Sequence, residues 1–194
     1  MPEKKSTDYD IVEFSTAKQL EKWYAKYHDK VDGIWLRMYK KDSRVKSVTR
    51  AEALDIALCF GWIDGLARRE NDLSYIQKYT PRRKRSIWSK INCDHIERLA
   101  KEGRMKPAGL AQVEAAKADG RWDNAYDSSR TIVEPEDFLK AIKRKKGAFA
   151  FYKTLSSQNR YAILVRIQIA KRANTRQRRI EKYVEMCANS EKLY

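Results

Sequence analysis

Hydrophobic and polar positions follow two different patterns along this chain. Over about the first 80 residues, short apolar runs alternate with amphipathic stretches, which predicts strands at 11–14 and 34–39 and a helix from Ser15 to His28. Ser15 is expected to cap that helix, because a hydroxyl can accept a hydrogen bond from a free N–H of the first turn. This part of the chain is therefore predicted to form a layer of strands and helices.

Residues 49–61 carry the signals of both ends of a helix. Thr49 and Glu52 have the spacing of a capping box, and Gly61 stands where a left-handed residue would end the helix. From Trp62 the pattern takes a period of two, and the run 73–79 supplies a return strand. A β-hairpin is therefore predicted at about 62–79.

The rest of the chain is predicted to be helical. Asn92 is expected to cap the first of these helices and Thr175 the last; the predicted helices cover 93–102, 107–120, 138–143, 147–155, 158–171 and 176–188. The fold class is α+β, with a small and mostly antiparallel sheet and helices first, followed by an all-helical part. We expect a division into an α+β layer at 1–90 and a helical part at 91–194 that packs on it as one unit.

Composition narrows the class of protein. The chain has 194 residues, 42% hydrophobic and 35% charged, which is typical of a folded globular protein rather than a disordered one. No apolar run approaches the roughly 20 residues of a membrane span, and the N-terminal residues lack the apolar segment of an export signal. These features predict a cytoplasmic protein.

Positive charge is concentrated toward the C-terminus. The formal net charge is +16, and residues 140–182 hold 14 Lys or Arg against a single acid, Glu181. Such clustering favours an anionic partner, with nucleic acid as one candidate, although it also occurs on solvated helix faces. A helix, a short turn and an Arg-rich second helix weakly suggest a helix-turn-helix. The candidate polyanion-binding residues are Arg172, Arg176, Arg179 and Lys182.

Cysteines and histidines favour neither a metal nor a catalytic site. Cys59, Cys93 and Cys187 form no CxxC pair and no even set, which is typical of free thiols in a reducing compartment. His28 and His95 have no metal-ligand spacing, and we expect His95 to have a plain helical role. The sequence also has no phosphate-binding loop and no evident pair of nucleophile and base. No metal, cofactor or catalytic residue is predicted, and an enzyme is disfavoured.

Aromatic and basic residues come together around the predicted hairpin. Trp62, Asp64 and Arg68 on the first strand and Tyr75, Gln77 and Tyr79 on the second would share one face of the sheet. Rings can stack on bases or sugars, and guanidinium groups can bind phosphates or carboxylates in a bidentate manner. Alternatively, Trp62 and Tyr79 pack under the C-terminal helices and Asp64 pairs with an arginine. The candidate ligand-binding residues are Trp62, Asp64, Tyr75, Tyr79, Arg82, Arg83 and Trp88.

Several longer segments resemble one family of bacterial proteins, named YdeI or OmpD-associated and also bacteriocin-protection proteins. The resemblance covers about residues 12–190 and lies in the segments 53–65, 79–92, 103–109, 119–126 and 175–180. The family's names imply a role in envelope stress or in resistance to antimicrobial peptides, and association with an envelope protein. They imply no catalytic residues.

Two functions remain open from the sequence alone. The first is a non-enzymatic stress or antimicrobial-resistance protein that binds an anionic partner through its basic and aromatic residues. The alternative is a small-molecule-binding protein or small enzyme with a pocket around Asp64, Arg82 and Trp88. The oligomeric state does not follow from the sequence.

Overall fold

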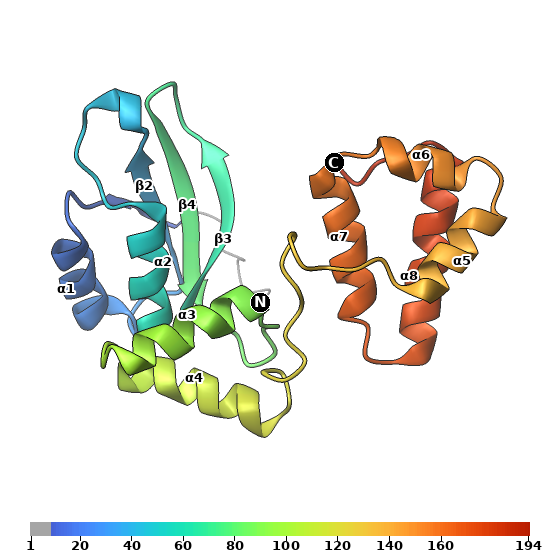
Figure 1. Ribbon diagram of the computed structural model, residues 1–194. Helices are drawn as coiled ribbons and strands as arrows, with labels where there is room; N and C mark the ends of the chain where they lie inside the picture. Colours follow the sequence, from blue (N-terminus) through green and yellow to red (C-terminus); the bar gives the residue numbers. More distant parts are fainter. Residues whose placement is uncertain (1–8) are drawn as a thin grey trace, which may run out of the picture. The chain divides into compact units, whose positions relative to one another are not determined.

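The computed structural model describes residues 9–194; the first eight residues, for which the sequence predicts no export signal, lie outside this part (Figure 1). The fold is α+β, as predicted. The N-terminal elements are β1 (Ile11–Glu13), α1 (Ala17–Tyr27), β2 (Ile34–Tyr39), a 3-10 turn (Lys41–Ser43), α2 (Arg50–Cys59), β3 (Trp62–Arg69) and β4 (Ser74–Pro81). The helices that follow are α3 (Lys90–Lys101), α4 (Pro107–Ala118), α5 (Glu136–Arg144), α6 (Ala148–Thr154), α7 (Ser157–Gln168) and α8 (Ala173–Ala188).

The chain divides into two compact units. The first unit comprises the residues up to Ser86 together with Asp94–Trp122, and the second comprises Ile87–Cys93 and Asp123–Tyr194. The division predicted at residue 90 places α3 and α4 differently, because α4 packs on α2 and so joins the sheet unit. That the helical part packs on the sheet as one unit stays a prediction.

The first unit is built on a four-stranded sheet with the order β1-β2-β4-β3. β1 pairs with β2 in parallel, and the other two pairs are antiparallel, so the sheet is mostly antiparallel as predicted. Alternate residues of β2, namely Ile34, Leu36 and Met38, are buried, together with Leu20 and Tyr24 of α1. Figure 1 shows α1 and α2 lying along the sheet.

A β-bulge in β3 changes which residues share a face. The hairpin register pairs Asp64 with Tyr79 but Ala67 with Gln77, so the pairing shifts between Asp64 and Ala67. Asp64 and Tyr79 therefore share a face, as predicted. Arg68 pairs with Ile76 and lies on the opposite face, so its predicted place beside Asp64 is wrong.

Helix caps show which local predictions hold. Thr49 and Glu52 form the predicted capping box, and Gly61 has the left-handed φ of 76° expected after α2. Thr16, not Ser15, caps α1, because Gln19 at the third helical position completes a capping box with Thr16. The Oγ of Ser89, not Asn92, accepts the first-turn hydrogen bond at the start of α3, from the N–H of Asn92.

The second unit has a separate hydrophobic core. α8 contacts α5, α6 and α7, and the buried side chains of the four helices meet in one cluster that includes Phe138, Tyr152, Ile163 and Ile180. α8 begins at Ala173 without a side-chain cap, so the cap predicted at Thr175 is wrong: Thr175 lies within the first turn.

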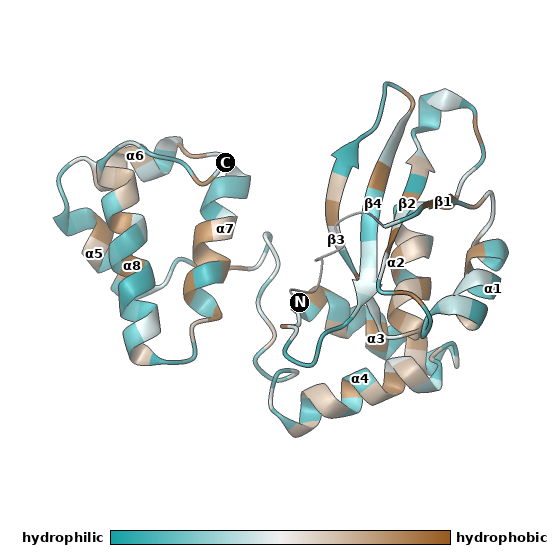
Figure 2. Ribbon diagram, turned by 180° about the vertical axis from the view of Figure 1, so that it is seen from behind, coloured by the Kyte–Doolittle hydropathy of each residue, from teal (hydrophilic) through white to brown (hydrophobic). Residues whose placement is uncertain are grey.

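Hydropathy differs along the elements of the first unit. In Figure 2, α2 is largely coloured as hydrophobic, whereas the arrowhead of β3 is hydrophilic. The burial of Ala53 and Ile56–Cys59 and the exposure of Gly65–Arg69 match those colours. No helix within residues 9–194 combines the length and the apolar character needed to cross a membrane.

Candidate functional site

Six cationic side chains gather where α7 turns into α8. Lys171 and Arg172 form the turn, and α8 continues with Arg176, Arg178, Arg179 and Lys182. We call these six residues the cationic turn. In Figure 1, α7 and α8 lie side by side and are joined by this short connection. The turn therefore combines cationic side chains with a helix N-terminus, whose dipole adds positive potential.

Two of the four predicted polyanion-binding residues have partners inside the second unit. Arg176 donates to both carboxylate oxygens of Asp137, at 2.7 and 2.8 Å, and this contact lowers the pKa of Asp137. Arg179 donates to the backbone carbonyl of Arg166. These two arginines tie α8 to α5 and α7, so a charge reversal at either position would also disturb packing.

The other members of the cationic turn face solvent. Arg172 and Lys182 are exposed, as are Lys171 and Arg178. Within residues 9–194, Asp137 is the only carboxylate that forms an ion pair with the cationic turn. Arg178 was not among the predicted binding residues, although it lies one helical turn before Lys182 and could have been found from that spacing.

Trp62 is a core residue of the first unit. Its side chain is 1% exposed, its indole N–H donates to the carbonyl of His28 at 3.0 Å, and its ring meets Tyr24 edge to face at 5.2 Å. It therefore packs against α1, and α1 rather than the C-terminal helices supplies the aromatic neighbours. The ring is not available for stacking on a ligand.

Apart from Arg68, the predicted hairpin residues form a row on one face of the sheet. Asp64 is half-buried and accepts a hydrogen bond from Arg50 at 3.2 Å. Tyr79 is fully buried, and burial, with a smaller contribution from the charge of Asp64, raises the pKa of its hydroxyl. The Tyr75 hydroxyl donates to the sulfur of Met38 at 3.7 Å. Of the alternative interpretation, the pairing of Asp64 with an arginine is thus observed, whereas Trp62 packs against α1.

The remaining predicted ligand-binding residues differ in how exposed they are and in the unit to which they belong. Arg82 is 5% exposed, and its backbone N–H donates to the carbonyl of Gly61. Arg83 is exposed, and its N–H donates to the hydroxyl of Ser86. Trp88 is buried and belongs to the second unit.

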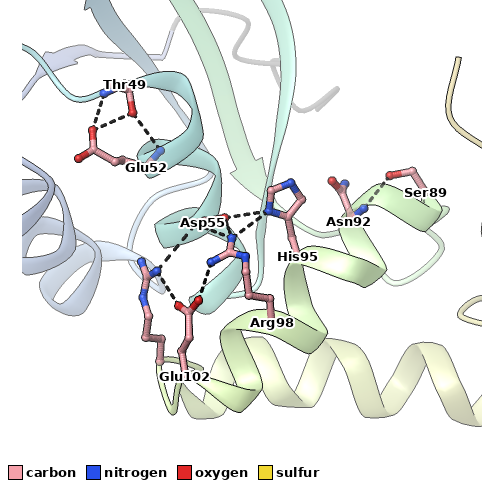
Figure 3. Close-up of polar contacts among 9 residues, drawn as sticks. Thr49, Glu52, Asp55, Ser89, Asn92, His95, Arg98 and Glu102 are labelled. Atoms are coloured by element: carbon pink, nitrogen blue, oxygen red, sulfur yellow. Dashed lines mark hydrogen bonds and ion pairs between the residues drawn. The ribbon is translucent and has the colours of Figure 1, made fainter. Parts of the chain in front are cut away.

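A charge cluster around Asp55 was missed by sequence reasoning (Figure 3). Both carboxylate oxygens of Asp55, on α2, accept from Arg98 of α3 at 2.7 Å, and Nδ1 of His95 lies 3.0 Å from Asp55. Arg98 also donates to Glu102, and this contact, with one from Arg104, lowers the pKa of Glu102. The cluster joins α2 to α3 and fixes His95, whose role is thus more than helical.

The cysteine thiols are buried. Cys59 and Cys187 are 3% and 0% exposed, and burial raises the pKa of each to about 11. At neutral pH both are therefore protonated thiols, as core residues should be. No group of three or more His, Cys, Asp or Glu side chains in the described part of the chain is arranged to hold a metal ion.

The fold and the cationic turn together define an α+β protein with a sheet unit and a cation-rich helical unit. Residues 12–112, just over half of the chain, match a domain of unknown function, DUF8412, and the chain belongs to this family. Residues 131–190 match the family described as bacteriocin-protection, YdeI or OmpD-associated. The resemblance to that family is thus confirmed, in the segment that holds α5–α8.

The two family matches follow the two units. Apart from residues 87–93, which belong to the helical unit, the DUF8412 match lies in the sheet unit, and the other match lies in the helical unit. The predicted resemblance extended over residues 12–190, but most of its motifs fall in the part that DUF8412 matches. Comparisons with curated proteins and with solved structures found no match.

Proposed function

We propose that this chain is a non-enzymatic binding protein whose helical unit holds an anionic partner at the cationic turn. The observation that carries the proposal is the lack of charge compensation there: of six cationic side chains, Arg176 alone pairs with a carboxylate within residues 9–194. Exposed cations that form no ion pair remain available to attract phosphates. Nucleic acid is the anionic polymer to test first, and the predicted role in stress or antimicrobial resistance rests on the description of the matched family.

The expected binding depends strongly on salt. Each phosphate that a cationic side chain neutralises releases condensed counterions, so the logarithm of the affinity falls by about 0.9 per contact for each logarithmic unit of salt on duplex DNA. Contacts from Arg172, Arg178 and Lys182 would therefore contribute a slope of about 3 in magnitude. A partner bound by apolar contacts would show almost no slope.

The test titrates the full chain against labelled duplex DNA, single-stranded DNA and RNA at two salt concentrations. The variant Arg172→Gln, Arg178→Gln, Lys182→Gln is compared with the control Lys18→Gln, Lys22→Gln, Lys46→Gln, which removes three exposed cations from the sheet unit. Both variants have the same net charge, so a general effect of charge weakens both equally. We expect the first variant to lose affinity and about three units of salt slope, and the control to lose much less.

Equal weakening in the two variants would contradict the proposal, because it would show that only total charge matters. Binding by the wild type that does not change with salt would contradict it as well.

The alternative function is a small-molecule-binding protein or small enzyme. Trp88 belongs to the helical unit, so the part of this candidate that lies in the sheet unit is Asp64 with Arg82, and one observation favours it. Asp64 is a half-buried carboxylate beside the buried hydroxyl of Tyr79, and the side chain of its partner Arg50 is 64% exposed. Asp64→Asn tests this alternative: it should leave polyanion binding unchanged and abolish binding of any small ligand at the sheet.

A further inference from the structure

A second site is suggested by a hollow in the helical unit, away from the cationic turn. The hollow has a volume of about 390 Å³, near the lower end of the range for small-molecule sites. The segment before α5 forms one wall, and α6 and α7 form the other. The lining residues are Ser129, Ile132, Val133, Glu134, Tyr152, Ser157, Arg160, Tyr161 and Leu164. We call it the α6–α7 hollow.

Two opposite charges line the α6–α7 hollow without forming an ion pair with each other. One oxygen of Glu134 accepts a hydrogen bond of 2.8 Å from the hydroxyl of Tyr152, which is 1% exposed. Burial and the contact with Glu134 raise the pKa of Tyr152, so the hydroxyl keeps its proton and holds the carboxylate in place. Within residues 9–194, neither Glu134 nor Arg160 forms an ion pair. The carboxylate and the guanidinium therefore remain available to a ligand that carries both charges.

Apolar side chains supply the rest of the wall. Ile132 is half-buried, Leu164 is 5% exposed, and Val133 is 77% exposed beside them. An aliphatic group that covered Val133 would remove apolar surface from water and add to affinity. The hollow thus offers one anionic group, one cationic group and an aliphatic surface.

We propose that the α6–α7 hollow binds a free α-amino acid with an aliphatic side chain. Glu134 receives the ammonium group, Arg160 receives the carboxylate, and the side chain lies against Ile132, Val133 and Leu164. Arg suits the carboxylate because its planar guanidinium can donate two parallel hydrogen bonds. The proposal uses no residue of the cationic turn, so it can succeed or fail independently of polyanion binding.

A series of matched ligands tests the charge requirement on the wild-type chain. The chain is titrated with L-leucine, with 4-methylpentanoate, which lacks the ammonium group, and with 3-methylbutylamine, which lacks the carboxylate. Chemical shifts of backbone amides report the location of binding. We expect leucine to perturb the amides around Glu134 and Arg160 and to bind at least about tenfold more tightly than either analogue.

Two substitutions assign the two charges. Glu134→Gln should weaken leucine about tenfold and leave 4-methylpentanoate unchanged, whereas Arg160→Gln should weaken leucine and leave 3-methylbutylamine unchanged. Glu191→Gln and Arg144→Gln remove the same charges from exposed positions of the same unit and should change nothing.

The proposal is overturned if leucine and its two analogues bind equally, or if leucine at up to about 10 mM perturbs no amide around the hollow. The ligand series uses the wild-type chain alone, so it decides the proposal even if a substituted chain fails to fold.

Discussion

The two units of this protein carry similar excess charge but arrange it differently. The sheet unit has 25 cationic against 18 acidic side chains, and the helical unit has 17 against 8. In the sheet unit, Arg37 lies between Glu13 and Glu70, and Arg98 lies between Asp55 and Glu102.

In the helical unit, Asp137 alone among the carboxylates that the structure describes pairs with the cationic turn. Cationic side chains thus join elements at Arg37 and Arg98, whereas most of the cationic turn forms no ion pair with a described carboxylate; elsewhere in the helical unit, ion pairs are formed by Lys90, Lys140 and Lys145. Net charge alone does not distinguish these two uses; the pairing of each cation does.

The largest expected effect tests packing in the sheet unit alone. A Cβ at Gly109 of α4 would lie 2.2 Å from the carbonyl oxygen of Cys59 on α2, so Gly109→Ala must push the two helices apart. We expect a loss of about 3 kcal/mol in the free energy of unfolding. Urea unfolding followed by tryptophan fluorescence measures it, since Trp23, Trp35, Trp62 and Trp122 all belong to this unit.

Gly103→Ala is the matched control for that measurement. Gly103 has a φ of 68°, but a Cβ there would meet nothing within 4 Å, so only the left-handed backbone is penalised, by about 1 kcal/mol. Equal losses for the two variants would refute the close contact between α2 and α4.

An intermediate effect is expected when the ion pair between Asp55 and Arg98 in the sheet unit is removed. Asp55→Asn removes the carboxylate whose two oxygens accept from Nη2 of Arg98 and, with it, the anion beside His95, which should lower the free energy of unfolding by about 1 to 2 kcal/mol. Chemical denaturation at pH 7 measures the loss. Glu102→Gln, at the exposed side of the same cluster, should cost less; a larger loss there would place the centre of the cluster elsewhere.

The smallest expected effect distinguishes a cation of the cationic turn that stabilises the fold from one that forms no ion pair. Arg176 lowers the pKa of Asp137 in the folded chain, so the pair stabilises the fold above the usual carboxyl pKa, and that stability is lost as the pH falls through the lowered value. Arg176→Gln should therefore cost about 0.5 kcal/mol at pH 7, with the difference from wild type vanishing once the pH is low enough to protonate Asp137 in the folded wild type.

Arg178→Gln is the counterpart of that substitution. We expect it to leave the stability unchanged at every pH and to weaken polyanion binding, since Arg178 is exposed. Thermal unfolding across pH, together with the salt titration, measures both properties. A loss of stability in Arg178→Gln equal to that in Arg176→Gln would remove the distinction between the two residues.

Local patterns predicted the fold better than they predicted the candidate sites. The capping box of Thr49 and Glu52 lies within four residues, and the hairpin follows from alternation along two adjacent strands, so both depend on short stretches of sequence. The β-bulge that turns Arg68 away from Asp64 lies between Asp64 and Ala67, where Gly65 interrupts the strand; a glycine inside a strand is a signal of a bulge that alternation alone does not use. Ser15 and Thr16 both carry a hydroxyl that could cap α1. Thr16 is the cap because Gln19 completes a capping box with it.

Contacts between distant residues could not be predicted in the same way. Asp55 and His95 are 40 residues apart and meet only because α2 and α3 pack together. Arg176 looked like a free cation in the sequence, and its partner Asp137 lies 39 residues earlier on α5. The concentration of charge on α8 was visible from the sequence, but which of its arginines form no ion pair was not.

The buried cysteines allow the opening of each unit to be measured by thiol labelling. Cys59 lies in the sheet unit and Cys187 in the helical unit, and both are protonated and shielded at neutral pH. A thiol-modifying reagent can reach either sulfur only when the surrounding helices separate, so the rate of labelling at each site reports how often that unit opens. Peptide mapping of the two sites in a single reaction would then time the opening of both halves of the molecule, with no engineered probe.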